Sequence, residues 1–329
     1  MYWDTKYILF TGAGFTANFG APLARDMWGL IFNHYAIQSQ PHIKDLLKRN
    51  FDFESVYFNI IEGDYDPKEK EAMAKAINDA YEQLDEIVRK WIFKTDSQYP
   101  TNYNNIKNLI INLIAKKNSK GFFFTINQDL FFERRPMTEY FALPGLEHLR
   151  HRFHGHTKKQ IDKAVLPTND WIEKEKRKIL SRKALYIKLH GSQDWLSSKG
   201  NNVMVLGGGK KDQIKKEPLL AHYFETFTEV VFERNRKILV IGYGFRDDHI
   251  NEILSKAVEA FDLEIFVISP QNQDEFFNHL KKKKHGTLLE RGISGYYPTT
   301  LKEMFFGEND PSFYYNLLRQ QFFELDPIK

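Results

Sequence analysis

The chain has 329 residues, of which 42% are hydrophobic and 15% aromatic, so it can bury a large core and is not a disordered chain. Its 47 basic and 43 acidic residues nearly balance, which argues against direct binding of nucleic acid through a strong overall field. The absence of cysteine excludes disulfides, thiol nucleophiles and zinc sites built on thiolates. No apolar run is long enough to span a bilayer, so we expect a cytoplasmic protein without a membrane partner.

The opening stretch KYILFTGAGFTANFGAP, residues 6–22, predicts a buried strand, a glycine turn and the start of a helix. Gly12, Ala13 and Gly14 keep the turn almost free of side chains, and with Ala17 they fit the spacing G-x-G-x-x-G/A. A pyrophosphate could bind backbone N–H groups there, at the positive end of the helix. A tight turn in any doubly wound domain also favours glycines, so this fragment alone leaves both interpretations open.

The next part of the chain is mostly helical in pattern. We predict a helix over residues 21–35 with Pro22 in its first turn, and amphipathic helices over 68–93 and 106–114. Conventional dinucleotide folds have a second strand here that ends in a ribose-binding acid, and none is visible. We therefore expect a helical insertion at about 40–120, packed beside the sheet.

Later apolar runs alternate with helical patterns. Strands are expected at 121–125, 184–189, 203–206, 237–241 and 263–268. Helices are expected at 171–182, 219–236, from about 249, and at 311–325. The alternation predicts an α/β fold, a Rossmann-like doubly wound parallel sheet of about six strands. Because the pattern weakens beyond Gly286, we expect one α/β domain over 1–285 and an aromatic-rich helical extension over 286–329.

Three polar clusters have ordinary structural interpretations, which we prefer. His148, His151, His154 and His156 are expected to be loop histidines, because their spacing fits no familiar metal-ligand pattern. The lysines at 281–284 predict a solvated helix end rather than a phosphate site. Asp247 and Asp248 are expected to cap the helix that begins near His249.

Four loops follow predicted strands: GAGFT, TINQD, HGS and GYGFRDD. The carboxyl ends of parallel strands meet at one edge of a sheet, where ligands bind. We expect residues 12–14 to hold a pyrophosphate, Asn127 and Asp129 to contact a ribose, and His190 to act as a general base or orienting group. Ser269, at another strand end, would contact the distal half of the ligand. A dinucleotide meets all these demands.

These loops resemble those of sirtuins. GAGFTANFGAP resembles their GAG-x-S-x-x-x-G-x-P loop, TINQD their TxNxD loop, and KLHGS the segment that carries their catalytic histidine. GYGFRDDHIN is closer still to the corresponding loop of bacterial sirtuin-like proteins that hydrolyse NAD in phage defence. The resemblance covers these four loops within residues 6–270.

Two departures from the sirtuin pattern bear on the activity. Protein-deacylating sirtuins usually carry a zinc module with four cysteines, and this chain has none. They also have aspartate, phenylalanine and arginine after the proline of the glycine loop, where Leu23, Ala24 and Arg25 follow Pro22 here. The resemblance therefore implies NAD+ cleavage without zinc and with water, rather than a peptide, as the acceptor.

The resemblance also implies roles for individual residues. Asn127 would position water and the ribose, His190 would contact the ribose hydroxyls or activate water, and Asp129 would position ribose or nicotinamide. Phe15 would cover the nicotinamide face. The other predicted NAD+-binding residues belong to the matched loops or to strand ends: Gly12, Ala13, Gly14, Thr16, Pro22, Thr125, Gly242, Gly244 and Ser269.

The implied function is that of an NAD+ glycohydrolase, which releases ADP-ribose and nicotinamide as the toxic effector of an antiphage system. The resemblance further implies a homo-oligomer and a separately encoded activator, such as a translocase-type ATPase, a nucleotide-processing sensor or a short Argonaute. Two other classes stay open. One is a non-catalytic NAD+ or ADP-ribose binding module, and the other is a protein deacylase or ADP-ribosyltransferase.

Overall fold

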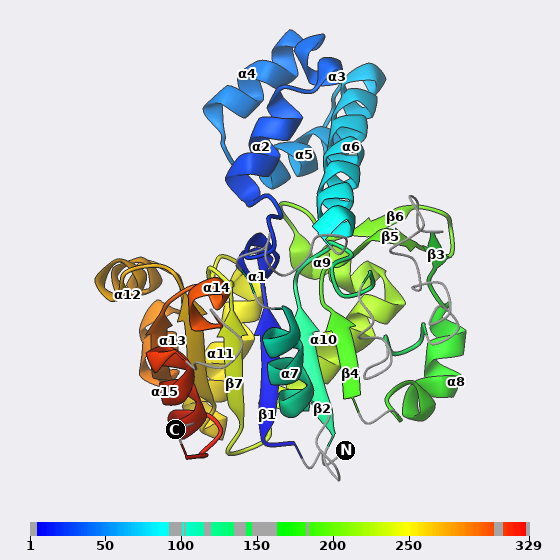
Figure 1. The fold of residues 1–329 in the computed structure, drawn as a ribbon. Coiled ribbons are helices and arrows are strands. Elements are labelled where there is room, and N and C mark those ends of the chain that lie inside the picture. The colour runs from blue at the N-terminus through cyan, green and yellow to red at the C-terminus, as the bar shows by residue number, and fades with distance from the viewer. Residues whose placement is uncertain are drawn as a thin grey trace.

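A six-stranded parallel sheet forms the centre of the protein (Figure 1). The computed structural model describes residues 5–91, 101, 103–114, 120–134, 143–146, 163–181, 184–305 and 312–326. The strands of the sheet are β1 (Tyr7–Thr11), β2 (Gly121–Thr125), β4 (Ala184–Lys188), β7 (Lys237–Ile241), β8 (Glu264–Ser269) and β9 (Ile293–Pro298). Every neighbouring pair in it is parallel.

The strand order is β4-β2-β1-β7-β8-β9, which is 3-2-1-4-5-6 when these strands are numbered along the chain. The chain first builds outward from β1 in one direction and then returns to build from β7 in the other. This order confirms the predicted doubly wound, Rossmann-like fold and places its switch point between β1 and β7. Every residue of β1, β2, β4 and β7 is buried, which explains their nearly continuous apolar sequences.

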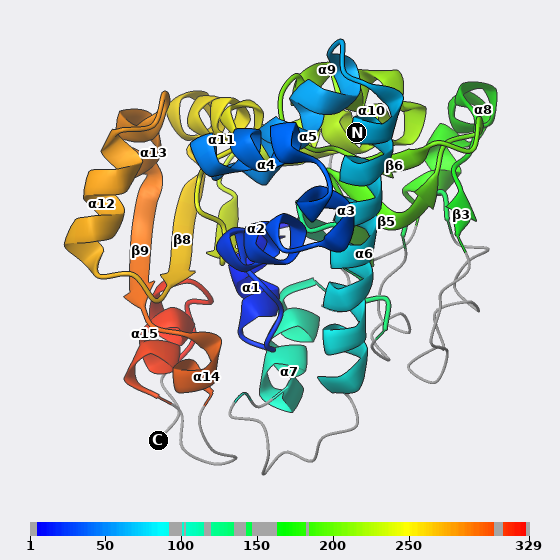
Figure 2. The ribbon, with the colours of Figure 1, turned by 90° about the horizontal axis from the view of Figure 1, so that it is seen from above.

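Helices cover both faces of the sheet (Figure 2). On one side lie α7 (Tyr103–Ile114), α14 (Leu301–Met304) and α15 (Phe313–Gln321). On the other side lie α10 (Pro218–Val231), α11 (Asp248–Phe261) and α13 (Gly286–Gly292). Two further helices are more peripheral: α8 (Asn169–Ile179) contacts α10, and α12 (Gln273–Lys281) contacts α13.

A lobe of helices stands over the carboxyl ends of the strands (Figure 1). This helical lobe consists of α2 (Ala24–Phe32), α3 (Tyr35–Gln38), α4 (Pro41–Arg49), α5 (Phe53–Glu62) and α6 (Pro67–Trp91). By contrast, α7 packs against β1 and β2. The helical pattern predicted over 40–120 therefore divides between the lobe and a helix of the sheet's own covering layer.

The predicted helix over 21–35 is wrong at its start. A one-turn helix, α1 (Ala13–Ala17), begins directly in the glycine turn, and α2 begins only at Ala24. Pro22 lies in the connection between them instead of in a first turn. The Asp26 carboxylate accepts a hydrogen bond from the Leu23 N–H at 3.0 Å, which satisfies a backbone donor at the start of α2.

A second, smaller sheet has the order β3-β5-β6 and contains β3 (Ala164–Val165), β5 (Gly191–Leu196) and β6 (Asn202–Met204). The strand predicted at 203–206 corresponds to β6 and so does not belong to the central sheet. Its place there is taken by β9, which the sequence does not predict. The sequence of β9, ISGYYP, contains a glycine and a proline, both of which are unfavourable in strands.

Residues 286–329 include part of the central core. Besides β9, the segment contributes Phe322, whose ring lies 5.1 Å from the ring of Tyr7 and 5.1 Å from that of Phe266. Phe322 is fully buried. The expected boundary at residue 285 therefore does not separate an appendage from the sheet, because the sheet's edge strand lies beyond it.

Candidate functional site

The loops after β1, β2, β4 and β7 are joined to one another by hydrogen bonds at the carboxyl edge of the sheet. The Asn127 Nδ2 donates to the Gly12 carbonyl at 3.1 Å, and the Gln128 Nε2 lies 3.5 Å from the His190 carbonyl. His190 Nε2 in turn lies 2.9 Å from Nε2 of His249, which follows β7. The structure thus brings together the early glycine turn, Asn127 and His190, which are widely separated in the sequence.

The glycine turn after β1 interlocks with the loop after β7. The N–H groups of Gly12 and Gly14 donate to the carbonyls of Ile241 and Gly242 at 3.1 and 2.9 Å. A Cβ on Gly12 or Gly14 would lie 2.7 Å from backbone atoms of Gly242, and Gly242 itself has φ +66°. Close packing of two backbones therefore explains these glycines without a ligand. Two N–H groups expected to bind a pyrophosphate already have protein acceptors.

Asn127 is held in place by backbone and side-chain contacts from two strands. Its N–H donates to Thr125 Oγ1 at 3.0 Å, and Thr125 is itself 2.9 Å from Thr11 Oγ1 in the neighbouring strand. Since Nδ2 donates to Gly12, the orientation of the amide is fixed. Among the described residues, none donates a hydrogen bond to the Asn127 Oδ1, which leaves this oxygen as an acceptor.

Asp129 connects the loop after β2 to α1. Its Oδ2 lies 3.1 Å from Thr16 Oγ1, and its Oδ1 accepts the N–H of Phe131 at 2.9 Å. Burial raises the pKa of this carboxyl, and the nearby Lys188 ammonium opposes that rise. The carboxylate therefore helps to build the site, and any contact it makes with a ribose would be additional to these two bonds.

Lys188, the last residue of β4, is a part of this edge that the sequence interpretation missed. Its Nζ is fully buried and lies 2.7 Å from Glu133 Oε1, 2.6 Å from the Asp129 carbonyl and 2.8 Å from Ser192 Oγ. Burial raises the pKa of Glu133 to about 7 although the Lys188 charge opposes the shift. This cluster anchors both loops that carry Asn127 and His190. The sequence could have indicated this role, because Lys188 is the one charged residue of the otherwise apolar strand ALYIK.

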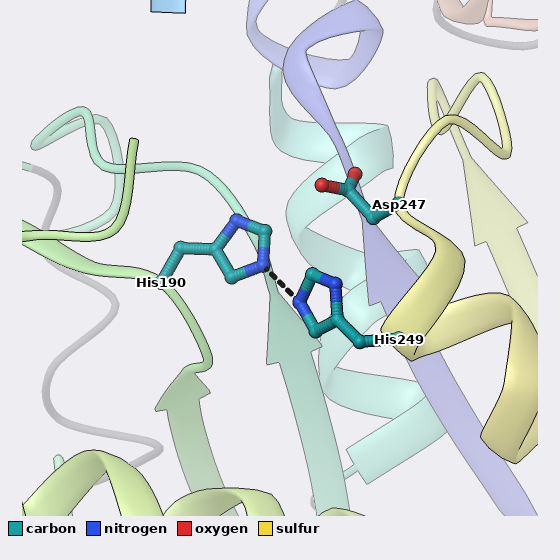
Figure 3. A group of neighbouring side chains, drawn as sticks. All are labelled: His190, Asp247 and His249. Carbon is teal, nitrogen blue, oxygen red and sulfur yellow. Dashed lines mark hydrogen bonds between the residues drawn. The ribbon is translucent and has the colours of Figure 1, made fainter. Parts of the chain in front are cut away.

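His190 and His249 form a buried imidazole pair (Figure 3). They are 3% and 5% exposed, respectively. Burial lowers the pKa of His190 well below its usual value and lowers the pKa of His249 to about 4. Both rings are therefore neutral at pH 7, and each carries one N–H and one unprotonated nitrogen. His249 is a second residue that the sequence interpretation missed, because there it named His249 only as the approximate start of a helix.

Asp247 lies beside the two imidazoles and connects them to the helical lobe. Its Oδ1 is 2.8 Å from Nζ of Lys210, at the start of α9 (Lys210–Lys216), and the same Nζ is 3.0 Å from Glu54 Oε2 in α5. The pKa of Asp247 is lowered, because the nearby histidines and Lys210 outweigh the effect of burial. Asp247 occupies the N-cap position of α11, as predicted, but its side chain makes no capping hydrogen bond and pairs with Lys210 instead.

We assign no metal to His190, Asp247 and His249, although their nitrogen and oxygen atoms lie within 4.8 Å of one another. The two imidazole nitrogens are at hydrogen-bond distance, whereas two nitrogens bound to one tetrahedral zinc ion would be roughly 3.4 Å apart. In addition, Asp247 Oδ1 is already paired with Nζ of Lys210. The four clustered histidines at 148–156 lie outside the described residues.

Three other residues predicted to contact NAD+, namely Phe15, Gly244 and Ser269, lie in different surroundings. The Phe15 ring is fully buried and packs 5.1 Å from Phe132 and 5.6 Å from Phe19, so it presents no free face for a nicotinamide. Gly244 is exposed beside the β7 loop. Ser269 ends β8, two strands from β1, and its Oγ accepts the N–H of Gln271 at 3.4 Å.

A surface hollow of about 650 Å³ lies elsewhere, on the helical lobe. Its lining includes Arg25, Trp28, His34, Tyr35 and Gln83, which belong to α2, α3, α6 and their connections. None of the residues predicted to bind NAD+ contributes to it. The hollow is therefore not the site formed by the four loops.

The sequence matches the family described as the SIR2-like domain over residues 121–289. The match covers about half of the chain. The chain belongs to this SIR2-like family. A solved structure described as a Sir2 homologue, a histidine-to-asparagine mutant in complex with ADP-ribose, is 16% identical with a TM-score of 0.40, over 90% of this chain and 87% of that one. Comparison with the curated proteins finds no match.

The SIR2-like match begins at β2 and ends in α13, so it includes the loops of Asn127, His190 and His249. It does not include β1 and the glycine turn, although β1 lies between β2 and β7 in the same sheet. Within the described residues of this SIR2-like chain, no helix is both long and apolar enough to cross a membrane.

Proposed function

We propose that the chain is an NAD+ glycohydrolase that converts NAD+ and water to ADP-ribose and nicotinamide. The observation that carries this proposal is the joining of the Asn127, His190 and glycine loops at the switch point of a SIR2-like sheet. Ligands of doubly wound sheets bind at such points. The ribose next to nicotinamide would lie between Asn127 and His190.

The chemistry requires the bond between nicotinamide and the anomeric carbon of the ribose to break. Nicotinamide takes the bonding electron pair and leaves as a neutral molecule, so no acid is needed. An oxocarbenium-like transition state forms, as in glycosidases. Water then forms the new C–O bond and loses a proton. Asn127 Oδ1 would accept one hydrogen bond from this water, and the neutral His190 would accept the proton.

The remaining predicted contacts follow from this placement. Ala13, at the first position of α1, has no intrahelical acceptor for its N–H and would bind the pyrophosphate. Because α1 has only one turn, its dipole adds little to that binding. Thr16, Thr125 and Asp129 would act mainly by holding the loops. With no cysteine in the chain, a zinc-supported peptide platform is not part of the proposal.

The activity is tested by following nicotinamide and ADP-ribose in the purified protein and in the Asn127→Ala and His190→Ala variants. Each change is expected to lower turnover by at least about 100-fold, because it removes water positioning or the proton acceptor. Asn278→Ala and His279→Ala, in exposed positions of α12, are matched controls that should retain turnover. Thermal unfolding must show that all four variants are folded. Near-normal turnover in either site variant would contradict its assigned role.

The products distinguish the alternative functions. Intact NAD+ with measurable binding would favour a sensor module, and turnover that depends on an acetyl-lysine peptide would favour a deacylase. Transfer of ADP-ribose to protein would favour an ADP-ribosyltransferase.

We propose that the cellular role is that of a cytoplasmic antiphage effector, which acts as a homo-oligomer and is activated by a separately encoded partner. The support is the resemblance of residues 242–251 to the corresponding loop of bacterial NAD-hydrolysing defence proteins. The test is the NAD+ content of cells that produce the chain with its neighbouring gene products. Infection should deplete NAD+ only when His190 is intact.

A further inference from the structure

The bond between His190 and His249 restricts where their protons can lie. A neutral imidazole carries one N–H, and the facing atoms here are both Nε2, 2.9 Å apart. One ring must therefore donate and the other accept. If His249 donates, then His190 carries its own proton on Nδ1 and cannot accept another there. If His190 donates, its Nδ1 is a free proton acceptor.

Among the described residues, no protein group bonds to the His190 Nδ1, and Figure 3 shows this atom on the side of the ring that faces away from His249. Nδ1 is therefore the nitrogen of His190 that is available to a substrate. The proton acceptor required by the proposed hydrolysis must be unprotonated there. That condition is met only when His249 accepts the Nε2 proton of His190.

The loop that carries His249 holds its ring against His190. Tyr243 Oη donates to Asn251 Oδ1 at 3.0 Å, and Asn251 Nδ2 donates to the Phe245 carbonyl at 2.9 Å. The His249 ring also stacks on Phe224, with centroids 5.6 Å apart. These contacts fix the first turn of α11, so His249 presents Nε2 to His190 without a ligand.

Asp247 supplies the opposite charge that a protonated pair would need. It lies near both rings in Figure 3, and its negative charge raises the pKa of each histidine, while Lys210 lowers both. Lys211 and Asp248 also act on His249, in opposite directions. Because Lys210 bridges Asp247 to Glu54 in the helical lobe, the charge at Asp247 is held by groups from both parts of the molecule.

We propose that His249 is a positioning residue for His190, accepting its Nε2 proton so that Nδ1 is the base, while Asp247 stabilises the positive charge that arises. This inference rests on the proposed hydrolysis. In the reacting step an O–H bond of water breaks, the oxygen bonds to the anomeric carbon, and the proton forms a new bond to His190 Nδ1. The resulting charge is shared through the His190–His249 hydrogen bond and is countered by Asp247.

The kinetic test compares His249→Phe, His249→Gln and Asp247→Asn with the control Glu259→Gln, an exposed carboxylate farther along α11. Phenylalanine preserves the stacking on Phe224 but cannot accept a proton, so kcat should fall about 100-fold with little change in KM. Glutamine can accept through its side-chain oxygen and should restore about 10-fold of that loss. Asp247→Asn should lower kcat about 10-fold and move the acid limb of the pH profile to lower pH, because a carboxylate that favours protonation is lost.

A second measurement does not depend on turnover. Nitrogen-15 NMR of histidine-labelled protein reports which ring nitrogens carry protons, and the His190 and His249 signals are identified by their loss in the Gln variants. We expect His190 to be protonated on Nε2 and His249 on Nδ1. A proton on His190 Nδ1 would overturn the inference, as would a His249→Phe variant with kcat within about twofold of wild type. If wild type released no nicotinamide, the proposed hydrolysis would fail and the NMR result alone would decide the proton arrangement.

Discussion

The edge of the sheet that carries the site is built in two different ways. Between β1 and β7, two backbones pack directly, with Gly14 against Gly242. Between β2 and β4, buried polar side chains make the contact, with Lys188 at their centre. The first junction depends on the absence of side-chain volume, and the second depends on matched charge. The stability of the β1–β7 junction should therefore be sensitive to an added side-chain atom, and that of the β2–β4 junction to the loss of a charge.

The largest effect is expected at the polar junction, in Lys188→Met. Removing the ammonium leaves Glu133 without its ion-pair partner in a site that is 1% exposed. Loss of one partner of a buried pair lowers the free energy of unfolding by roughly 3–5 kcal/mol. Urea-induced unfolding of the variant and wild type at pH 8 measures this difference.

The pH dependence of that difference follows from Glu133. Its folded pKa is already raised to about 7, and loss of Lys188 removes a charge that held it down, so the folded pKa rises further. A carboxyl with a raised folded pKa binds more protons when folded, so stability falls as pH rises above the unfolded value. The deficit of Lys188→Met should thus be smaller at pH 5 than at pH 8. The double variant Lys188→Met/Glu133→Gln should remove most of this pH dependence, and an equal deficit at both pH values would contradict the charge-based account.

The backbone junction is tested by adding one methyl group. In Gly242→Ala the new Cβ would lie 2.1 Å from the Phe15 nitrogen, and alanine would have to adopt φ +66°. Strain and overpacking together should lower the free energy of unfolding by roughly 2–4 kcal/mol. Gly244→Ala is the matched control in the same loop, because its Cβ would approach nothing closer than 3.8 Å. Equal unfolding midpoints for the two variants would show that the two backbones can separate at little cost.

The comparison also explains which parts of the fold the sequence predicts. Buried parallel strands have almost uninterrupted apolar sequences, as in Lys237–Ile241, so five of the six central strands are recognisable. The edge strand β9 lacks this pattern, because ISGYYP is only partly buried. The segment at 203–206 is apolar, but apolarity does not specify which sheet a short strand joins. That choice depends on Gly191, at φ +73°, turning the chain into β5.

In the candidate site, too, some residues can be predicted from local sequence and others cannot. The glycine turn, Asn127 and His190 are found from local spacing, because each follows an apolar strand. Lys188 and His249 have no such pattern, since their partners Glu133 and His190 are 55 and 59 residues away in the chain. The burial of Phe15, a predicted ligand contact, was missed for a related reason. Its ring packs against Phe131 and Phe132, and aromatic burial is not visible in a loop motif.

The smallest effect is expected where the helical lobe meets the polar junction. Tyr81 in α6 donates a hydrogen bond to Gln128 Oε1, while Gln128 Nε2 donates to the Val205 carbonyl at 2.8 Å. Tyr81→Phe should lower the free energy of unfolding by about 1 kcal/mol, because a buried acceptor loses its donor. Gln128→Met removes the acceptor of the same hydrogen bond. In a double-mutant cycle the effects of the two changes on the free energy of unfolding should therefore be non-additive by about 1 kcal/mol. Strict additivity would mean that the Tyr81–Gln128 hydrogen bond contributes no measurable coupling, and the polar connection from the lobe would then rest on its other ion pairs, Asp85 with Arg134 and Lys210 between Glu54 and Asp247.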